Sequence, residues 1–183
     1  MKTSSLLKKS KFLSKLLRHN PELIESTIDK EGWMNTSDLI KSGEFTIDEL
    51  EQIVKEDNKE RYELTKDKRK IRALQGHSIS GINPGFVQEI PPGVLYHGTS
   101  TNLVENIMNS GGLKSMSRDY IHLSTDLDTA VKVGKRHGNP CVIIIDSLQM
   151  SKDGILFLKS KNGYYLVKET IPTKYFIEIK FDF

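Results

Sequence analysis

SKLLRHNP, at residues 14–21, has the pattern of the end of an amphipathic helix. Apolar residues recur at three- and four-residue steps, as in the buried stripe of a helix that packs on a core: Leu6, Leu13, Leu16 and Leu17. Pro21 forbids further helix, so we predict a helix over 5–19 with Arg18 and His19 in its last turn. One cation there would complement the helix dipole, but the dipole alone does not explain a pair.

Two more helices and a β-hairpin are predicted in the first half of the chain. A short helix is capped at residues 36–38, and a capping box at 46–49 opens a third helix. RYELT (61–65) and IRALQ (71–75) have the composition of β-strands and flank a charged turn. Such a hairpin is too small to be stable alone and must pack on the helices. Three helices followed by a hairpin predict a winged-helix lobe, a common nucleic-acid-binding module.

The composition is that of a folded, soluble protein. Hydrophobic residues make up 37% of the 183 residues and charged residues 28%, which excludes a disordered chain and allows one domain or two small ones. The longest apolar run, CVIIID (141–146), is too short to span a bilayer, and we find no secretory signal. Cys141 lies in that run, so we expect a buried strand residue and no disulfide framework. We therefore expect a cytoplasmic protein that does not bind membranes.

The positive charge is unevenly distributed, although the net charge is only +3. The first twenty residues hold six Lys or Arg and no acid, and residues 55–72 hold eight more beside five acids. A basic face built from two segments suits a phosphate-rich partner such as RNA, with Lys8, Lys11 and Lys15 as contacts. A solvated helix face would explain the same charges, so this pattern alone leaves both interpretations open.

A segment rich in glycine and proline separates the two halves of the chain. Residues 76–94 hold four Gly and three Pro with little periodicity, which is typical of a linker. Beyond it we predict strands VLYHGT, IHLST, CVIIID, ILFL, GYYLV and KYFIEIKF, with helices TNLVENIMNS and DLDTAVKVGKRHG. The whole chain is then an α+β protein with a first lobe at 1–78, a linker at 79–94 and a β-rich second lobe at 95–183.

Two short polar motifs stand at the ends of predicted strands in the second lobe. His97-Gly98-Thr99 follows VLY, and His122 and Ser124 belong to the motif HLS. A histidine followed by glycine can offer its ring and the glycine backbone to a ribose or a planar amide, because glycine allows close approach. A histidine satisfied by its neighbours would explain HGT more simply.

Common nucleotide and metal motifs are missing from the sequence. It contains no Gly-x-Gly-x-x-Gly and no Walker A segment, so we expect neither a Rossmann nor a P-loop site. His77, His97, His122 and His137 are too far apart for zinc-ligand spacing, and we expect chemistry that needs no metal.

Eight segments occur in order along nearly the entire chain: SKLLRHNP, EGW, NKERYEL, IRALQGHS, LYHGT, SRDYIHLS, VGKRHG, and NGYYLV with IPTKYF. Together they resemble the RNA 2′-phosphotransferase family, also known as tRNA 2′-phosphotransferase. Any one segment is a weak match, but eight at suitable spacing are specific. The resemblance implies a winged-helix N-terminal lobe and a C-terminal lobe of the ADP-ribosyltransferase fold.

The resemblance also implies a transferase that removes an internal 2′-phosphate from RNA of the spliced-tRNA type, with NAD⁺ as co-substrate. In the first step the 2′-phosphate attacks C1″ of the nicotinamide ribose and expels nicotinamide, which leaves RNA-phospho-ADP-ribose. In the second step the ribose O2″ attacks phosphorus. The products are RNA with a free 2′-hydroxyl, ADP-ribose 1″,2″-cyclic phosphate and nicotinamide.

The family's catalytic residues correspond to Arg18, His19, Arg61 and Arg118. A phosphomonoester carries about −1.5 to −2 charges at neutral pH, and guanidinium groups can bind its oxygens bidentately. A histidine, whose unperturbed pKa is about 6.5, is suited to proton transfer at O2″ or at the departing 2′-oxygen. This chemistry is a candidate explanation for the Arg-His pair that ends the first helix.

The resemblance further implies binding residues for both substrates. For NAD⁺ they are the two strand-end motifs, with His97, Gly98, Thr99, His122 and Ser124. For RNA, Gln75 and His77 join the lysines, although these two residues would also serve simply to cap the hairpin. Val167 stands where many proteins of the ADP-ribosyltransferase fold carry a Glu that activates a hydroxyl nucleophile. A phosphate nucleophile is already anionic and needs no general base.

Two other functions remain open at this stage. The first is an ADP-ribosyltransferase that stops after transfer to a nucleic-acid phosphate, since it would share the NAD⁺ site. The second is a non-enzymatic winged-helix nucleic-acid binder, which would keep the basic first lobe but has no use for the histidine motifs or Arg118.

Overall fold

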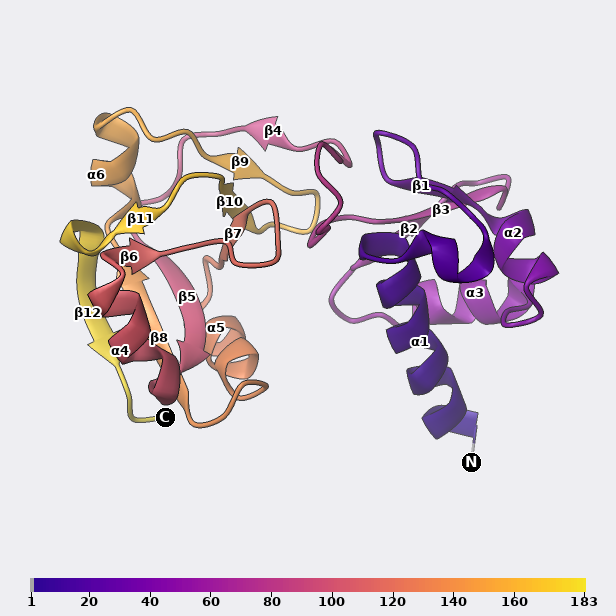
Figure 1. Ribbon diagram of the computed structural model, residues 1–183, viewed down its shortest axis with the longest axis horizontal. Helices are drawn as coiled ribbons and strands as arrows, with labels where there is room; N and C mark the ends of the chain where they lie inside the picture. The colour runs from indigo at the N-terminus through magenta and orange to yellow at the C-terminus, as the bar shows by residue number, and fades with distance from the viewer. Residues whose placement is uncertain (1) are drawn as a thin grey trace. The chain divides into compact units, whose positions relative to one another are not determined.

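The computed structural model describes residues 2–183, which divide into two compact units between Gly85 and Phe86 (Figure 1). The division falls inside the linker predicted at 79–94. Each unit has its own hydrophobic core, so each is described by itself.

The first unit combines helices with a small antiparallel sheet. Its elements are α1 (Lys2–Arg18), the 3₁₀ helix η1 (Pro21–Ile24), β1 (Trp33–Asn35), α2 (Thr36–Lys41), α3 (Ile47–Lys55), β2 (Tyr62–Leu64) and β3 (Lys70–Ala73). The strand order is β1–β3–β2, so the hairpin strand β3 lies in the middle. The three predicted helices are present as α1, α2 and α3, and the predicted hairpin is formed by β2 and β3.

Two elements of the first unit were not predicted. β1 has only three residues, too few for an alternating pattern to be visible in the sequence, and it pairs Trp33 with Arg72 of β3. Pro21 ends α1, as predicted, but it also opens η1, because proline is well suited to the first position of a helix.

Local sequence signals explain the helices of the first unit. Leu13, Leu16 and Leu17 of α1 are fully buried, as the apolar stripe predicted. The capping box before α3 is confirmed: the Thr46 hydroxyl accepts from the Glu49 N–H, and the Glu49 carboxylate accepts from the Thr46 N–H. These helices pack in one core with the hairpin.

The second unit consists mainly of short strands. Its elements are β4 (Val87–Gln88), β5 (Leu95–Ser100), α4 (Thr101–Asn109), β6 (Gly112–Leu113), β7 (Ile121–Leu123), α5 (Leu127–Gly134), β8 (Pro140–Ile145), α6 (Ser147–Lys152), β9 (Leu158–Lys159), β10 (Tyr165–Val167), β11 (Ile171–Pro172), the 3₁₀ helix η2 (Thr173–Tyr175) and β12 (Phe176–Lys180). The sheets have the orders β4–β9–β10–β7, β11–β6 and β12–β8–β5. Every strand pair described within residues 2–183 is antiparallel, and the predicted mixture of helices and strands is confirmed.

The second unit departs from prediction in its short elements. β4, β6, β11 and α6 were not predicted, because two- to six-residue elements carry almost no periodicity. α5 ends at Gly134 rather than continuing to Gly138, which has a positive φ of 133°. Cys141 is fully buried in β8, as expected.

Candidate functional site

The end of α1 is held by the turn that follows β3. The backbone N–H of Ser78 donates to the carbonyl of Arg18 at 3.0 Å. The Ser78 hydroxyl lies 2.9 Å from Nδ1 of His19, so it orients the imidazole ring. Ser78 was not predicted as a site residue, although it belongs to the QGHS segment.

Gly76 of the same turn lies against the Arg18 guanidinium. Its φ is +87°, a conformation that favours glycine. A Cβ at this position would lie 3.5 Å from Cζ of Arg18. The structure therefore brings Arg18 and His19 together with the turn at 76–78.

His77 is enclosed within the first unit. It is only 5% exposed, and neither ring nitrogen has a hydrogen-bond partner among the residues that the structure describes. A Cβ on Gly32 would lie 3.2 Å from its Nε2. Desolvation, with smaller contributions from the charges of Arg18, His19 and Arg72, lowers the pKa of His77 from 6.5 to about 4. His77 is therefore neutral at physiological pH. Little of its surface is available to RNA.

We expect His77→Leu to flatten the pH dependence of the first unit's stability. Between pH 6.5 and 4 the unfolded chain binds a proton that the folded unit does not, so stability is lost as the pH falls. By pH 4.5 this linkage amounts to about 2.5 kcal/mol. Urea unfolding at pH 7 and 4.5, followed by the fluorescence of the single tryptophan, Trp33, measures it. Equal losses in wild type and variant would show that His77 is not the responsible group.

Gln75 is also buried, with 7% exposure, and lies just before this turn. The predicted lysines differ from it: Lys8, Lys11 and Lys15 are all exposed on α1. Contact of any of these residues with RNA stays a prediction.

Arg61 is held by an acidic residue that was not predicted. Asp57 follows α3 closely, and its side chain is only 2% exposed. Its Oδ1 accepts from Nε of Arg61 at 2.8 Å and lies 2.8 Å from Nη2, while Oδ2 accepts from the Arg61 backbone N–H. Asp57 thus occupies the guanidinium edge formed by Nε and Nη2, and Nη1 takes no part in this contact.

Arg61 and the Arg18-His19 pair flank the same short segment of chain. The N–H of Leu74 donates to the carbonyl of Arg61 at 2.8 Å, and Ser78, four residues later, bonds to Arg18. Three of the four predicted catalytic residues therefore lie around residues 74–78 in the first unit.

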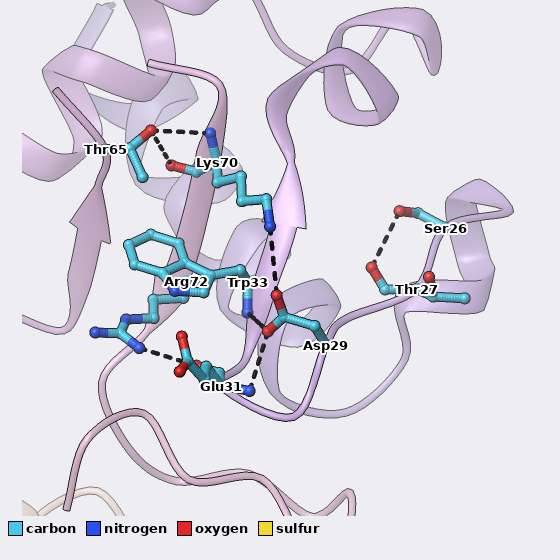
Figure 2. Close-up of polar contacts among 8 residues, drawn as sticks. All are labelled: Ser26, Thr27, Asp29, Glu31, Trp33, Thr65, Lys70 and Arg72. Carbon is cyan, nitrogen blue, oxygen red and sulfur yellow. Dashed lines mark hydrogen bonds and ion pairs between the residues drawn. The ribbon is translucent and has the colours of Figure 1, made fainter. Parts of the chain in front are cut away.

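Arg72 of β3 contacts Trp33 and Glu31 of the EGW segment. Figure 2 shows the Arg72 guanidinium over the Trp33 ring, 4.2 Å from its centroid, and its hydrogen bond to the carbonyl of Glu31 at 3.1 Å. Arg72 also donates to the Glu63 carboxylate at 2.8 Å and is buried. The EGW segment thus packs on β3 through a cation–π contact, and its Gly32 faces His77.

The two histidine motifs of the second unit are connected through hydrogen bonds. Nδ1 of His97 lies 3.1 Å from the carbonyl of His122, and Nδ1 of His122 lies 3.0 Å from the carbonyl of Tyr120. Because a carbonyl only accepts, each Nδ1 carries the proton when the ring is neutral, and each Nε2 has a lone pair. Desolvation is the largest cause of a lowered pKa at His97, which favours this neutral form.

Gly98 directs its backbone toward the free edge of β5. Tyr96 exchanges two hydrogen bonds with Ser124, at 2.8 and 2.9 Å, on the side of β5 away from β8. Since backbone groups alternate along a strand, the N–H and C=O of Gly98 point to that same side. These paired groups match the acceptor and donor of a planar amide.

The missing side chain of Gly98 has a structural cause. A Cβ there would lie 1.8 Å from the carbonyl oxygen of Ala130 in α5. Glycine at this position therefore lets α5 pack on β5. The predicted approach of a ligand to the Gly98 backbone stays a prediction.

We expect Gly98→Ala to destabilise the second unit by about 3 kcal/mol or more. The new Cβ would clash with the backbone carbonyl of Ala130, which cannot move away by a side-chain rotation. Gly93→Ala is the control, since a Cβ there meets no atom within 4 Å among the described residues. Thermal unfolding of both variants tests this, and similar midpoints would contradict the packing argument.

The remaining predicted residues of the second unit differ in their exposure and contacts. Thr99 is buried, and the Ser124 hydroxyl exchanges hydrogen bonds with the backbone of Asp126 at 3.0 Å. Arg118 lies exposed in the loop between β6 and β7. Val167 is fully buried in β10, so its side chain belongs to the core.

Residues 2–183 lack both a cluster of potential metal ligands and a helix suited to span a membrane. In this range no three His, Cys, Asp or Glu side chains gather where they could hold a metal ion. No helix in the same range combines the length and apolar character needed to cross a membrane.

Comparison with known proteins gives a consistent result. The family model described as "RNA 2'-phosphotransferase, Tpt1 / KptA family" matches residues 4–169. A "Probable RNA 2'-phosphotransferase" of Fusobacterium nucleatum is 44% identical over 175 residues, which cover 92% of this chain and 96% of the relative. Proteins with the same description from Flavobacterium johnsoniae and Acaryochloris marina are 43% and 41% identical, each over 176 residues and 93% of this chain, and over 94% and 96% of the relatives.

Proposed function

Because this chain belongs to the RNA 2′-phosphotransferase family, we propose that it transfers an internal 2′-phosphate from RNA to NAD⁺. The products would be RNA with a 2′-hydroxyl, ADP-ribose 1″,2″-cyclic phosphate and nicotinamide. We assign a winged-helix fold to the first unit and an ADP-ribosyltransferase-like fold to the second.

The observation that best supports this proposal is the grouping of Arg18, His19 and Arg61 around residues 74–78. Asp57 occupies one edge of the Arg61 guanidinium, so the Nη1 edge is available to two oxygens of a phosphate. Two guanidinium groups offset the charge of a phosphomonoester, which is about −1.5 to −2. His19 is oriented at Nδ1 by Ser78, so proton transfer falls to Nε2.

The second unit offers groups that fit NAD⁺. When bound, NAD⁺ supplies an electrophilic ribose carbon with nicotinamide as its leaving group. The Nε2 lone pair of His97 can accept from a ribose hydroxyl, and the Gly98 N–H and C=O can pair with the carboxamide. Arg118 would bind phosphate oxygens. The apolar Val167 provides no general base, which suits a nucleophile that is already an anion.

One experiment distinguishes the candidate functions. The protein is incubated with 2′-phosphorylated RNA and NAD⁺, and nicotinamide, RNA and nucleotide products are resolved with time. Nicotinamide with cyclic phosphate supports the proposal. RNA-phospho-ADP-ribose as the end product would indicate an ADP-ribosyltransferase instead, and unchanged NAD⁺ would indicate a binding protein.

We expect His97→Ala to raise the KM for NAD⁺ by about tenfold, because one hydrogen bond to a ribose hydroxyl is lost. Affinity for 2′-phosphorylated RNA, measured by fluorescence anisotropy without NAD⁺, should stay within about twofold. A collapse of RNA affinity with an unchanged KM for NAD⁺ would overturn the assignment of His97.

A further inference from the structure

The exposed face of α1 carries a line of lysines. Lys8, Lys11 and Lys15 follow one another at three- and four-residue steps, and all three are exposed. We call these three residues the lysine stripe. Arg18 is the next position on the same line, so the stripe leads along the helix to the Arg18-His19 pair. From Lys8 to Arg18 the helix rises by about 15 Å.

The charges of this stripe are largely not neutralised. Lys9, which lies off the line, contacts Glu49 at 2.7 Å. By contrast, neither Lys8 nor Lys11 forms an ion pair with any side chain that the structure describes. Lys15 makes a small contribution to the lowered pKa of Glu22, which is due chiefly to a hydrogen bond from Asn20. Two cations of the stripe therefore have no neutralising partner among the side chains that the structure describes.

The second basic segment of the sequence is different. Three of its hairpin cations contact acids of the same unit: Lys68 contacts Glu51 at 2.7 Å, Lys70 contacts Asp29 at 3.5 Å, and Arg69 contacts Asp67 at 3.8 Å. Arg72 is buried and forms an ion pair with the half-buried Glu63 at 2.6 Å. Although the sequence places more Lys and Arg here than on α1, the local acids cancel most of their charge. The two segments are therefore not equivalent as surfaces for a polyanion.

We propose that the lysine stripe binds the phosphate backbone of single-stranded RNA next to the 2′-phosphate, and that the β2–β3 hairpin does not. This inference rests on the proposed function and specifies how its RNA substrate is held. Cations that release counterions from RNA gain most when no protein acid competes for them. Contacts to backbone phosphates carry no base information, so this binding is independent of sequence.

The geometry also gives the binding a direction. The stripe runs away from Arg18 along one uninterrupted helix, α1, toward the N-terminus (Figure 1). A strand whose 2′-phosphate lies at the Arg18-His19 pair can therefore follow the stripe with only one of its two flanks. Extending the RNA on that flank adds contacts with the lysines, and extending it on the other does not.

The test uses the whole protein, without NAD⁺, and three labelled RNAs. One is a minimal oligonucleotide with the 2′-phosphate, and the others extend it by several nucleotides on the 5′ or the 3′ side. Binding is measured by anisotropy from 50 to 200 mM salt. Lys8→Gln/Lys11→Gln removes two charges from the stripe, and Lys66→Gln/Arg69→Gln removes two from the exposed hairpin as a matched control.

In the wild type, one extension should tighten binding over the minimal RNA and the other should not. Lys8→Gln/Lys11→Gln should lose that gain and reduce the salt slope for the favoured RNA by about 1.4, since each single-strand contact contributes about 0.7. Over this salt range the wild type should thus lose about sevenfold more affinity than the variant. The hairpin variant should keep the wild-type slope.

Three results would overturn the inference: equal slopes in wild type and stripe variant, equal losses in the stripe and hairpin variants, or equal gains from both flanks. Failure of the proposed function has a separate signature. In that case 2′-phosphorylated RNA would bind no better than the same RNA with a 2′-hydroxyl, and NAD⁺ would not be consumed.

Discussion

His19→Ala should accumulate RNA-phospho-ADP-ribose, whereas the wild type should show almost none. The first step expels nicotinamide, a good leaving group, and depends mainly on positioning of the anionic phosphate. The second step needs proton transfer at the attacking hydroxyl or the departing 2′-oxygen. Loss of a general acid–base group lowers the rate of such a step by about 10²- to 10⁴-fold. Step two should therefore become rate-limiting in the variant.

A time course with labelled 2′-phosphorylated RNA and NAD⁺, resolved on a gel, measures both steps. Ser78→Ala is the matched variant, because it removes the hydroxyl that lies 2.9 Å from Nδ1 of His19 and leaves the imidazole in place. It should accumulate less of the intermediate than His19→Ala. If His19→Ala slows nicotinamide release as much as product formation, with no intermediate, then His19 serves the first step or binding.

Much of the fold of the first unit could be predicted because its signals are local. The apolar period and Pro21 predict the end of α1 within one residue, and the capping box at 46–49 predicts the start of α3. β1 could not be predicted, because its pairing of Trp33 with Arg72 depends on a residue almost forty positions away. Short strands of this kind take their structure from their neighbours rather than from their own sequence.

The candidate site divides in the same way. Arg18 and His19 could be predicted as candidate catalytic residues from their types and a resemblance, but the groups that contact them could not. Ser78 reaches His19 only because the turn after β3 folds back on α1. Gly98 likewise has a contact that the sequence did not reveal, because its Cα faces the backbone of Ala130 in α5. A glycine in a sequence does not reveal which group approaches it.

Asp57 shows how a signal can be present and still be missed. It stands four residues before Arg61, the spacing of a helical ion pair, but α3 ends before it. The contact forms in the turn after the helix, where both carboxylate oxygens of Asp57 face Arg61. A search for acids near predicted catalytic arginines, without the requirement of a helix, would have found it.

Asp57→Ala should reduce turnover by about 10²-fold, because the Arg61 guanidinium loses the group that fixes its orientation and about 1 Å of misplacement can cost that much. Asp57→Asn keeps one acceptor oxygen that can bridge Nε and Nη2, but its amide nitrogen cannot accept from the Arg61 backbone N–H. It should therefore retain more activity than Asp57→Ala and less than the wild type. The fluorescence of Trp33 during urea unfolding reports whether the first unit of each variant is folded.

A double-mutant cycle decides whether Asp57 acts through Arg61 alone. If it does, Asp57→Ala costs nothing further in an Arg61→Ala background, because there is no guanidinium left to orient. Asp57→Ala and Arg61→Ala should then also accumulate RNA-phospho-ADP-ribose, since the proposed role of the Arg61 guanidinium is to stabilise the charge that develops on the phosphate oxygens in the second step. Losses that multiply in the double variant would assign Asp57 a separate role and leave the orientation of Arg61 to other contacts, such as the Tyr62 ring 5.3 Å from its Cζ.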